Sequence, residues 1–232
     1  MPERPPPRQF TLDLGHRPAL GRDDFLVADS NRAAVAWIDR WPDWPQPALI
    51  LHGPAGCGKS HLVQVFAARN GAVVVDGARL TADQPPSLVM RERPVAVENA
   101  DRSGDETALL HLFNLARESH VPLLLTAGGP PARWSLRLPD LCSRLNAQPS
   151  VAIAEPDDAL MAAVLVKMFA DRQIRVGEEC LVYLLRRMER SFATARGVVA
   201  AADSLALATR RPVNPALLET VLATLEGETS LK

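Results

Sequence analysis

The chain has 232 residues, 47% of them hydrophobic, and its 26 basic and 27 acidic residues leave a formal net charge of −1. This size and apolar content allow one sizeable core with a smaller appended lobe, and the near-zero charge excludes a global field that would attract nucleic acid. The three cysteines, Cys57, Cys142 and Cys180, fit neither a metal-binding spacing nor a disulfide framework.

The N-terminal region, which we place at residues 1–20, is a proline-rich tail without a signal-peptide pattern. Within it, residues 9–14 (QFTLDL) alternate apolar and polar side chains, as a half-buried strand does. This hexapeptide is either an edge strand or tail patch packed on its own domain, or a peptide presented to a groove on another protein. In the second case Gln9 would hydrogen-bond the rim of the groove. The apolar anchors would be Phe10, Leu12 and Leu14.

Residues 21–155 alternate between helical and strand-like patterns. A helical pattern follows the N-cap candidates Asp29 and Ser30, and Leu109, Leu112, Phe113 and Ala116 share one face of a later helix. Short apolar runs that read as buried strands lie at residues 48–53, 72–75, 95–97, 123–125 and 150–156. This alternation predicts an α/β core with a parallel five-stranded sheet that helices cover on both faces.

Residues 156–232 contain four successive helical patterns with no strand between them. We therefore predict a small all-helical lobe, or lid, after the α/β core of residues 21–155. One of its helices carries Arg186, Arg187 and Arg190, a cluster that is more typical of a solvated face than of a phosphate or partner contact. No apolar run in the chain is long enough to span a membrane, so we expect a cytoplasmic protein.

Residues 53–60 (GPAGCGKS) match the phosphate-loop pattern G-x-x-x-x-G-K-[ST], between an apolar strand and a helix as the motif requires. The glycines let backbone N–H groups converge on phosphate oxygens, and the helix N-terminus adds its positive dipole end. Lys59 is expected to bridge the β- and γ-phosphates of ADP or ATP, and the Ser60 hydroxyl to ligate Mg²⁺. The predicted cofactor-binding residues are Gly53, Pro54, Ala55, Gly56, Cys57, Gly58, Lys59, Ser60 and His61.

The strand at residues 95–97 is followed by Glu98 and Asn99, where a hydrolysing phosphate-loop enzyme normally has an Asp that binds Mg²⁺ and a second group that activates water. Glu98 can still bind Mg²⁺ through water, whereas Asn99 is neutral and cannot act as a general base. The two residues are therefore either a degenerate catalytic pair or polar loop residues after a strand. We expect slow unaided hydrolysis or none, and we interpret Asp101 as solvated or capping.

The order of these motifs resembles an AAA+ ATPase of the DnaA type, over nearly the whole chain, and among these the DnaA-related regulators of the Hda type. The segments that carry the resemblance are DDFLVADSNRAAVAWI, GPAGCGKSHL, LLLTAGGPPARW, LPDLCSRL and FATARGVVAAADSL. The resemblance implies that Arg144 is an arginine finger and that Arg196 reaches the nucleotide phosphates from the lid. Their other interpretations are an ion pair with Asp140 for Arg144, and a solvated face or lid salt bridge for Arg196.

Two departures from the family pattern concern hydrolysis. The polar residue of sensor I falls near Gly128, which has no side chain to orient water, and Thr126 is the nearest substitute. Together with Asn99, this favours a module that holds nucleotide over a fast motor, and it mildly favours ADP over ATP. The sequence does not decide whether the resident nucleotide is ADP or ATP, or whether the protein forms a homo-oligomer.

The resemblance implies a bacterial, replisome-associated regulator that binds the DNA polymerase III sliding clamp (β subunit) through residues 9–14. It also implies that the protein promotes hydrolysis of ATP bound by the initiator DnaA, with Arg144 acting in trans, and so lowers replication initiation. The alternatives are a stand-alone ATPase or helicase-loader-like factor, and a DNA-binding initiation factor. Because the charge is balanced and the chain ends at Lys232, soon after the predicted lid, we do not expect sequence-specific DNA binding.

Overall fold

The computed structural model describes residues 26–229, with side chains described up to Leu225. The predicted clamp-binding residues Gln9, Phe10, Leu12 and Leu14 lie outside the described residues. Along the described part of the chain, no helix is long and apolar enough to cross a membrane.

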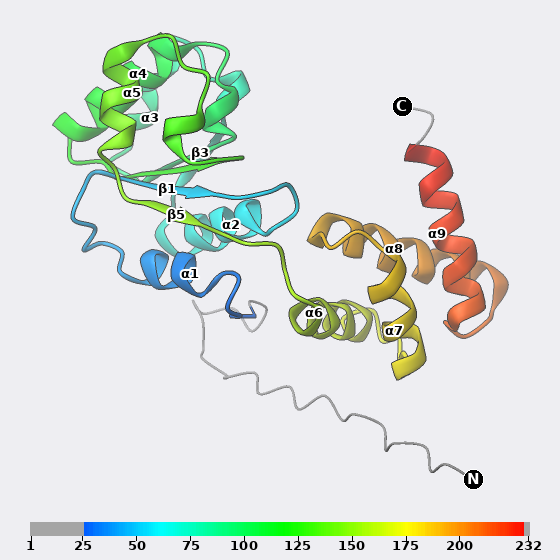
Figure 1. Ribbon diagram of the computed structural model, residues 1–232. Coiled ribbons are helices and arrows are strands. Elements are labelled where there is room, and N and C mark those ends of the chain that lie inside the picture. The colour runs from blue at the N-terminus through cyan, green and yellow to red at the C-terminus, as the bar shows by residue number, and fades with distance from the viewer. Residues whose placement is uncertain (1–25, 230–232) are drawn as a thin grey trace.

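A five-stranded parallel sheet forms the centre of the α/β lobe (Figure 1). Its strands are β1 (Ala48–His52), β2 (Val73–Asp76), β3 (Val95–Glu98), β4 (Leu123–Ala127) and β5 (Ser150–Ala152). They are arranged in the order β2-β3-β4-β1-β5. β1 lies between β4 and β5, so the loop that follows it reaches the interior of the carboxyl edge of the sheet, where ligands bind in open parallel sheets.

Helices cover both faces of this sheet (Figure 1). The helices of the α/β lobe are α1 (Arg32–Asp39), α2 (Lys59–Asn70), α3 (Gln84–Val89), α4 (Glu106–Glu118) and α5 (Pro139–Asn146). Side chains alternate along a strand, so Ile50 of β1 packs with α3, α4 and α5, whereas Leu49 and Leu51 pack with α1 and α2. The predicted parallel sheet flanked by helices is confirmed.

The remaining helices form a separate lobe with its own apolar core (Figure 1). They are α6 (Asp158–Ala170), α7 (Glu178–Arg187), α8 (Phe192–Thr209) and α9 (Pro215–Thr229). Phe169, Leu184, Val198 and Leu218 are fully buried there. Of the basic cluster, Arg190 pairs with Asp158 of α6 at 2.9 Å, which ties α6 to the turn before α8.

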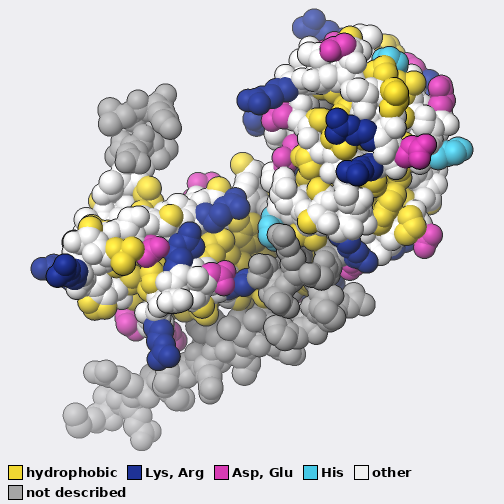
Figure 2. All heavy atoms as spheres, turned by 180° about the vertical axis from the view of Figure 1, so that it is seen from behind, with side chains coloured by type: hydrophobic (Ala, Val, Ile, Leu, Met, Phe, Trp, Pro, Cys, Tyr) yellow, Lys and Arg dark blue, Asp and Glu magenta, His cyan; other side chains and the backbone are white. Residues whose placement is uncertain are grey.

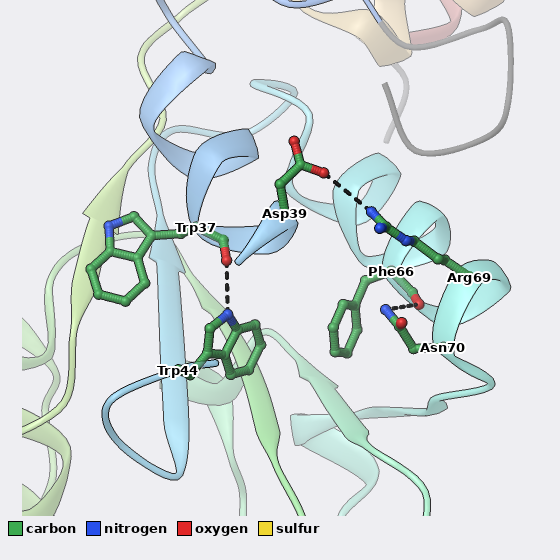
Figure 3. Close-up of polar contacts among 6 residues, drawn as sticks. All are labelled: Trp37, Asp39, Trp44, Phe66, Arg69 and Asn70. Carbon is green, nitrogen blue, oxygen red and sulfur yellow. Dashed lines mark hydrogen bonds and ion pairs between the residues drawn. The ribbon is translucent and has the colours of Figure 1, made fainter. Parts of the chain in front are cut away.

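Contacts between α1, the loop after it and α2 fix the first helix on the sheet (Figure 3). The Trp44 Nε1–H donates to the carbonyl oxygen of Trp37 at 2.7 Å, and the Trp44 ring stacks on Phe66 with 5.5 Å between ring centroids. Arg69 of α2 forms an ion pair with Asp39 of α1 at 3.2 Å. These contacts position the N-terminal end of α1 beside the site described below.

Two predicted element boundaries are corrected. The N-cap of α1 is Asn31, not Asp29 or Ser30, which lie in the turn before it. The buried Asn31 side chain does not cap the helix but fixes this turn, since it accepts the N–H of Ala28 and donates to the carbonyl of Leu26. The strand predicted at 150–156 ends at Ala152. Beyond it the Ala154 N–H donates to the carbonyl of Ser30 instead of to β1, and the chain leaves the sheet toward α6.

Candidate functional site

The loop between β1 and α2 borders a cavity of about 290 Å³, which we call the phosphate-loop cavity. Four elements meet there: the N-terminus of α2, the carboxyl ends of β3 and β4, and the start of α8. The residues that line it are Gly53, Ala55, Gly56, Gly58, Lys59, Ser60, His61, Asn99, Arg102, Gly128, Ala193 and Arg196. Most predicted cofactor-binding residues are thus together. Pro54 and Cys57 belong to the loop but are not among the lining residues.

Two glycines of the loop are required by close approaches of other segments. A Cβ atom at Gly53 would overlap the carbonyl oxygen of Ile153, next to the end of β5. Gly56 has φ +74°, a left-handed conformation that favours glycine, and a Cβ there would overlap the Cβ of Ser191. The pattern of glycines therefore reflects contacts from β5 and from the helical lobe as well as the curl of the loop.

The start of α8 docks directly on the loop. The Phe192 N–H donates to the carbonyl oxygen of Gly56 at 3.1 Å, and a Cβ at Gly58 would meet the Phe192 ring at 3.1 Å. Ser191 caps α8 by accepting the Thr194 N–H at 3.0 Å. This docking brings Arg196, one turn into the helix, to the wall of the cavity.

Lys59 lies at the first position of α2 with its ammonium group held over the loop. Its Nζ donates to the carbonyl oxygens of Gly53 and Pro54, at 2.8 and 2.7 Å, and lies 3.8 Å from the Cys57 Sγ. A cation and backbone N–H groups at a helix N-terminus are the features that bind phosphate. The glycines keep space open beside the loop, and Lys59 places a positive charge there. The loop can therefore accommodate a chain of phosphates.

His52, at the end of β1, adds no positive charge next to the loop at neutral pH. Burial lowers the pKa of His52, and the charges of Arg133 and Lys59 lower it further. Its ordinary value is 6.5, so the ring is neutral at neutral pH. The positive charge of the site therefore comes from lysine and arginine side chains and not from this histidine.

The two predicted catalytic residues at the carboxyl end of β3, Glu98 and Asn99, occupy different surroundings. Asn99 lines the cavity in a left-handed conformation, φ +53°, with its N–H donating to the Thr126 hydroxyl at 3.1 Å. Glu98 is half-buried and does not line the cavity. Its Oε1 is buried and has no hydrogen-bond partner among the described residues. The neutral Asn99, and not the carboxylate, thus faces the place where water would have to be activated.

Asp101 does not cap a helix and is only partly exposed, so our interpretation of it as solvated or capping holds at most for one of its two oxygens. Its Oδ2 accepts the N–H of Gly128 at 2.8 Å, and its buried Oδ1 has no hydrogen-bond partner among residues 26–229. The carboxylate therefore joins the turn after β3 to the end of β4. The next residue, Arg102, lines the cavity. Sequence reasoning missed it, and only its position next to the acidic strand end could have indicated it.

The side chains that could hold Mg²⁺ at this site are few. In the described part of the chain, no group of three or more His, Cys, Asp or Glu side chains could hold a metal ion. Mg²⁺ bound to a nucleotide needs few protein ligands, because phosphates and waters supply the others. Ser60 lines the cavity and Glu98 has an oxygen without a partner, so these two residues stay the predicted ligands.

A second cavity, of about 180 Å³, adjoins the first on the β5 side of β1. Its lining residues come from the start of α1, from α2, α6 and α8, and are Leu26, Asn31, His61, Leu160, Val164, Lys167, Met168, Asp171, Phe192 and Arg196. The two cavities share His61 and Arg196. Apolar side chains combined with polar groups are typical of sites for small organic ligands, and we call this the adjoining cavity.

Arg144, the predicted arginine finger, lies on α5 and does not line the phosphate-loop cavity. Its Nε donates to Asp140 one turn earlier at 2.9 Å, and its side chain is 26% exposed. The single chain therefore shows the intrahelical ion pair. A role of Arg144 on a neighbouring molecule stays a prediction.

A larger cavity, of about 650 Å³, lies between α3 and α4, far in the fold from the phosphate loop. Its walls include Val89, Leu115, His111 and the exposed Met90. It lacks the converging glycines and cations of the phosphate-loop cavity. We therefore take the smaller, charged cavity as the functional site.

Comparisons with known proteins concern the sequence and the fold. No family model matches the chain. The initiator DnaA of Clavibacter sepedonicus is 23% identical over 231 residues, which covers 88% of this chain and 48% of that protein. The chain spans about half the length, or less, of the curated relatives it matches first.

Among solved structures, domain III of Thermotoga maritima DnaA superposes with a TM-score of 0.73 at 18% identity, covering 87% of this chain and 94% of that domain. DnaA from Aquifex aeolicus bound to AMPPCP superposes with a TM-score of 0.61 at 18% identity, covering 76% and 62%. The chain therefore has the AAA+ fold of DnaA domain III and is related to DnaA in sequence.

Proposed function

We propose that this protein is an adenine-nucleotide-binding AAA+ regulator that acts on a DnaA-type initiator. One observation carries the proposal: the phosphate-loop cavity keeps its binding groups but presents Asn99 and Gly128 where a hydrolytic site needs a base and a water-orienting side chain. The AMPPCP bound to Aquifex aeolicus DnaA, which shares this fold, supports an adenine nucleotide as the ligand.

In this proposal the loop and the lid bind the nucleotide together. The loop N–H groups, Lys59 and Arg196 would neutralise the phosphates, and the adjoining cavity would take the nucleoside. Mg²⁺, held by Ser60 and through water by Glu98, would neutralise further phosphate charge. Because α8 docks on Gly56, binding in this cavity would also hold the lid against the α/β lobe.

The regulatory step is assigned to Arg144 acting in trans. A planar guanidinium stabilises the charge that develops on phosphoryl oxygens when water attacks the γ-phosphate and ADP leaves. Arg144 would have to exchange its bond to Asp140 for this contact. Arg144 is half-buried and Asp140 is exposed, and an intrahelical ion pair near the surface contributes about 1 kcal/mol or less, so the exchange costs little.

The tether in this proposal is the peptide at residues 9–14, which would bind the sliding clamp. Gln9→Ala combined with Leu12→Ala should abolish capture of the protein on immobilised clamp and leave ADP affinity unchanged. Capture equal to that of the wild type would remove the tether from the proposal.

A DNA-binding initiation factor is the less favoured function. On the face shown in Figure 2, the described Lys and Arg side chains lie scattered over both lobes among Asp and Glu side chains. A binding site for duplex DNA usually shows a basic patch or stripe. We therefore keep DNA binding as an outcome of the assay below and not as the proposal.

The test is ATP turnover by purified DnaA on clamp-loaded DNA, with and without this protein. We expect the wild type to accelerate turnover and Arg144→Ala to reduce that acceleration at least about 10-fold. The control variant Arg117→Ala, which changes an exposed arginine on α4, should accelerate turnover as the wild type does. Absence of acceleration by the wild type, or full acceleration by Arg144→Ala, would contradict the adaptor function. Turnover that needs only this protein and ATP would favour a stand-alone ATPase.

A further inference from the structure

The phosphate-loop cavity carries one more cation than the sequence motifs predict. Lys59, Arg102 and Arg196 reach it from three different elements: α2, the 3₁₀ turn η2 (Ala100–Arg102) and α8. The lining residues of the cavity include no Asp or Glu. Within the described part of the chain, no residue forms an ion pair or a hydrogen bond with the guanidinium of Arg102.

The turn that carries Arg102 is held at two points by β4. The Asn99 N–H donates to the hydroxyl of Thr126, which is 1% exposed, and Asp101 accepts the N–H of Gly128. Arg102 is the residue after Asp101, so its backbone is fixed relative to the end of β4. A guanidinium on a fixed backbone loses less conformational freedom when it binds an anion than one on a mobile loop does.

The topology indicates which phosphate Arg102 would meet. The adjoining cavity lies on the β5 and α6 side of β1, and it meets the phosphate-loop cavity at His61 and Arg196. Arg102 and Asn99 follow β3, on the opposite side of β1. A nucleotide with its nucleoside in the adjoining cavity therefore has its last phosphate nearest to β3.

We propose that Arg102 binds the terminal phosphate of a nucleoside triphosphate in this chain's own site. The proposal rests on the proposed nucleotide binding and adds a preference within it. From the sequence, Asn99 and Gly128 offer the terminal phosphate no charged partner, which mildly favours ADP over ATP. Arg102 supplies a planar, permanently charged donor at that end, so this site distinguishes triphosphate from diphosphate without a side chain at the sensor I position.

The experiment is calorimetric titration of the full chain with Mg²⁺-AMPPCP and with Mg²⁺-ADP. Arg102→Ala should weaken AMPPCP binding about 10-fold, as expected for loss of a charge-assisted hydrogen bond at a partly exposed site. Its ADP affinity should stay within about 2-fold of the wild type, because the diphosphate ends before this contact. Arg102→Lys should fall between, since it keeps the charge without the planar fork.

A matched control is Arg79, which ends the neighbouring 3₁₀ turn η1 (Gly77–Arg79), is also exposed and does not line the cavity. Arg79→Ala should bind both nucleotides as the wild type does. Equal weakening of ADP and AMPPCP by Arg102→Ala, or no weakening of either, would overturn the assignment. Failure of the wild type to bind either nucleotide would instead overturn the proposed nucleotide binding, and this inference with it.

Discussion

The two ends of the phosphate-loop cavity differ in how completely they are built. At the loop end, glycines that exclude a Cβ, a lysine held by two loop carbonyls and the first turn of α8 converge on one place. At the strand end, the groups that face the cavity are the neutral Asn99, the backbone of Gly128 and Arg102. The loop end has what binding requires, whereas the strand end lacks a base.

This difference shows that binding and hydrolysis depend on separate parts of one cavity. A chain can lose the groups that activate water and keep those that hold phosphate, because they lie on different strands. Asn99 illustrates the loss, since it lines the cavity with a neutral amide that cannot act as a general base. The predictions below first perturb the loop end and then its surroundings.

The largest effect is expected at the contact between the loop and the lid. Gly56→Ala introduces a Cβ that overlaps Ser191 at a residue with φ +74°, and we expect it to lower the free energy of unfolding by about 2 to 4 kcal/mol. Urea unfolding measures this loss.

The control for that variant is Gly71→Ala at the end of α2. Gly71 has a similar φ of +66°, but nothing lies within 4 Å of an added Cβ, so we expect a loss of only about 1 kcal/mol from backbone strain. Equal losses in the two variants would mean that the lid does not press on the loop in solution.

The next effect concerns the ammonium group of the loop. Lys59→Met keeps much of the side-chain length but removes the charge, and we expect ADP affinity to fall about 30-fold or more, as for loss of charge-assisted hydrogen bonds to phosphate. Calorimetric titration measures the change. An ADP affinity within about 2-fold of the wild type would show that the loop end does not bind the phosphates.

The smallest effect is a pH dependence of stability from His52. Because its pKa is lower in the folded chain than the ordinary 6.5, the unfolded chain binds more protons below that value. The stabilising contribution is therefore full above pH 6.5 and is lost as the pH falls toward the folded pKa. Between about pH 7.5 and pH 5.5, the free energy of unfolding should therefore fall less in His52→Gln than in the wild type. An identical loss in both proteins would contradict this origin.

Local sequence patterns predicted the loop end well and the strand end in part. The pattern GPAGCGKS, with the apolar run before it, specifies a strand, a turn and a helix through residues that are neighbours in the chain. The neutral character of Asn99 and the lack of a side chain at Gly128 also follow from residue identity alone. The predicted alternation of helices and strands is confirmed in the parallel sheet.

Other features depend on contacts between distant residues and could not be predicted in this way. The order of the strands, the bond from Phe192 to Gly56 and the bond from Asp101 to Gly128 join segments far apart in sequence. Arg102 follows an acidic residue and reads as an ordinary surface arginine until the 3₁₀ turn places it at the cavity. The helix α1 begins after Asn31 and not after Asp29 or Ser30, because residues 29–31 form a turn that the Asn31 side chain holds by its bonds to Leu26 and Ala28.

The most direct test of the separation between binding and hydrolysis is single-turnover hydrolysis of ATP by the purified chain alone, measured under conditions where calorimetry shows that the nucleotide is bound. We predict tight binding with turnover near the uncatalysed background, and an Asn99→Ala variant within about 3-fold of the wild type, because a neutral amide supplies no base. Rapid hydrolysis by the isolated chain that Asn99→Ala abolishes would contradict the account.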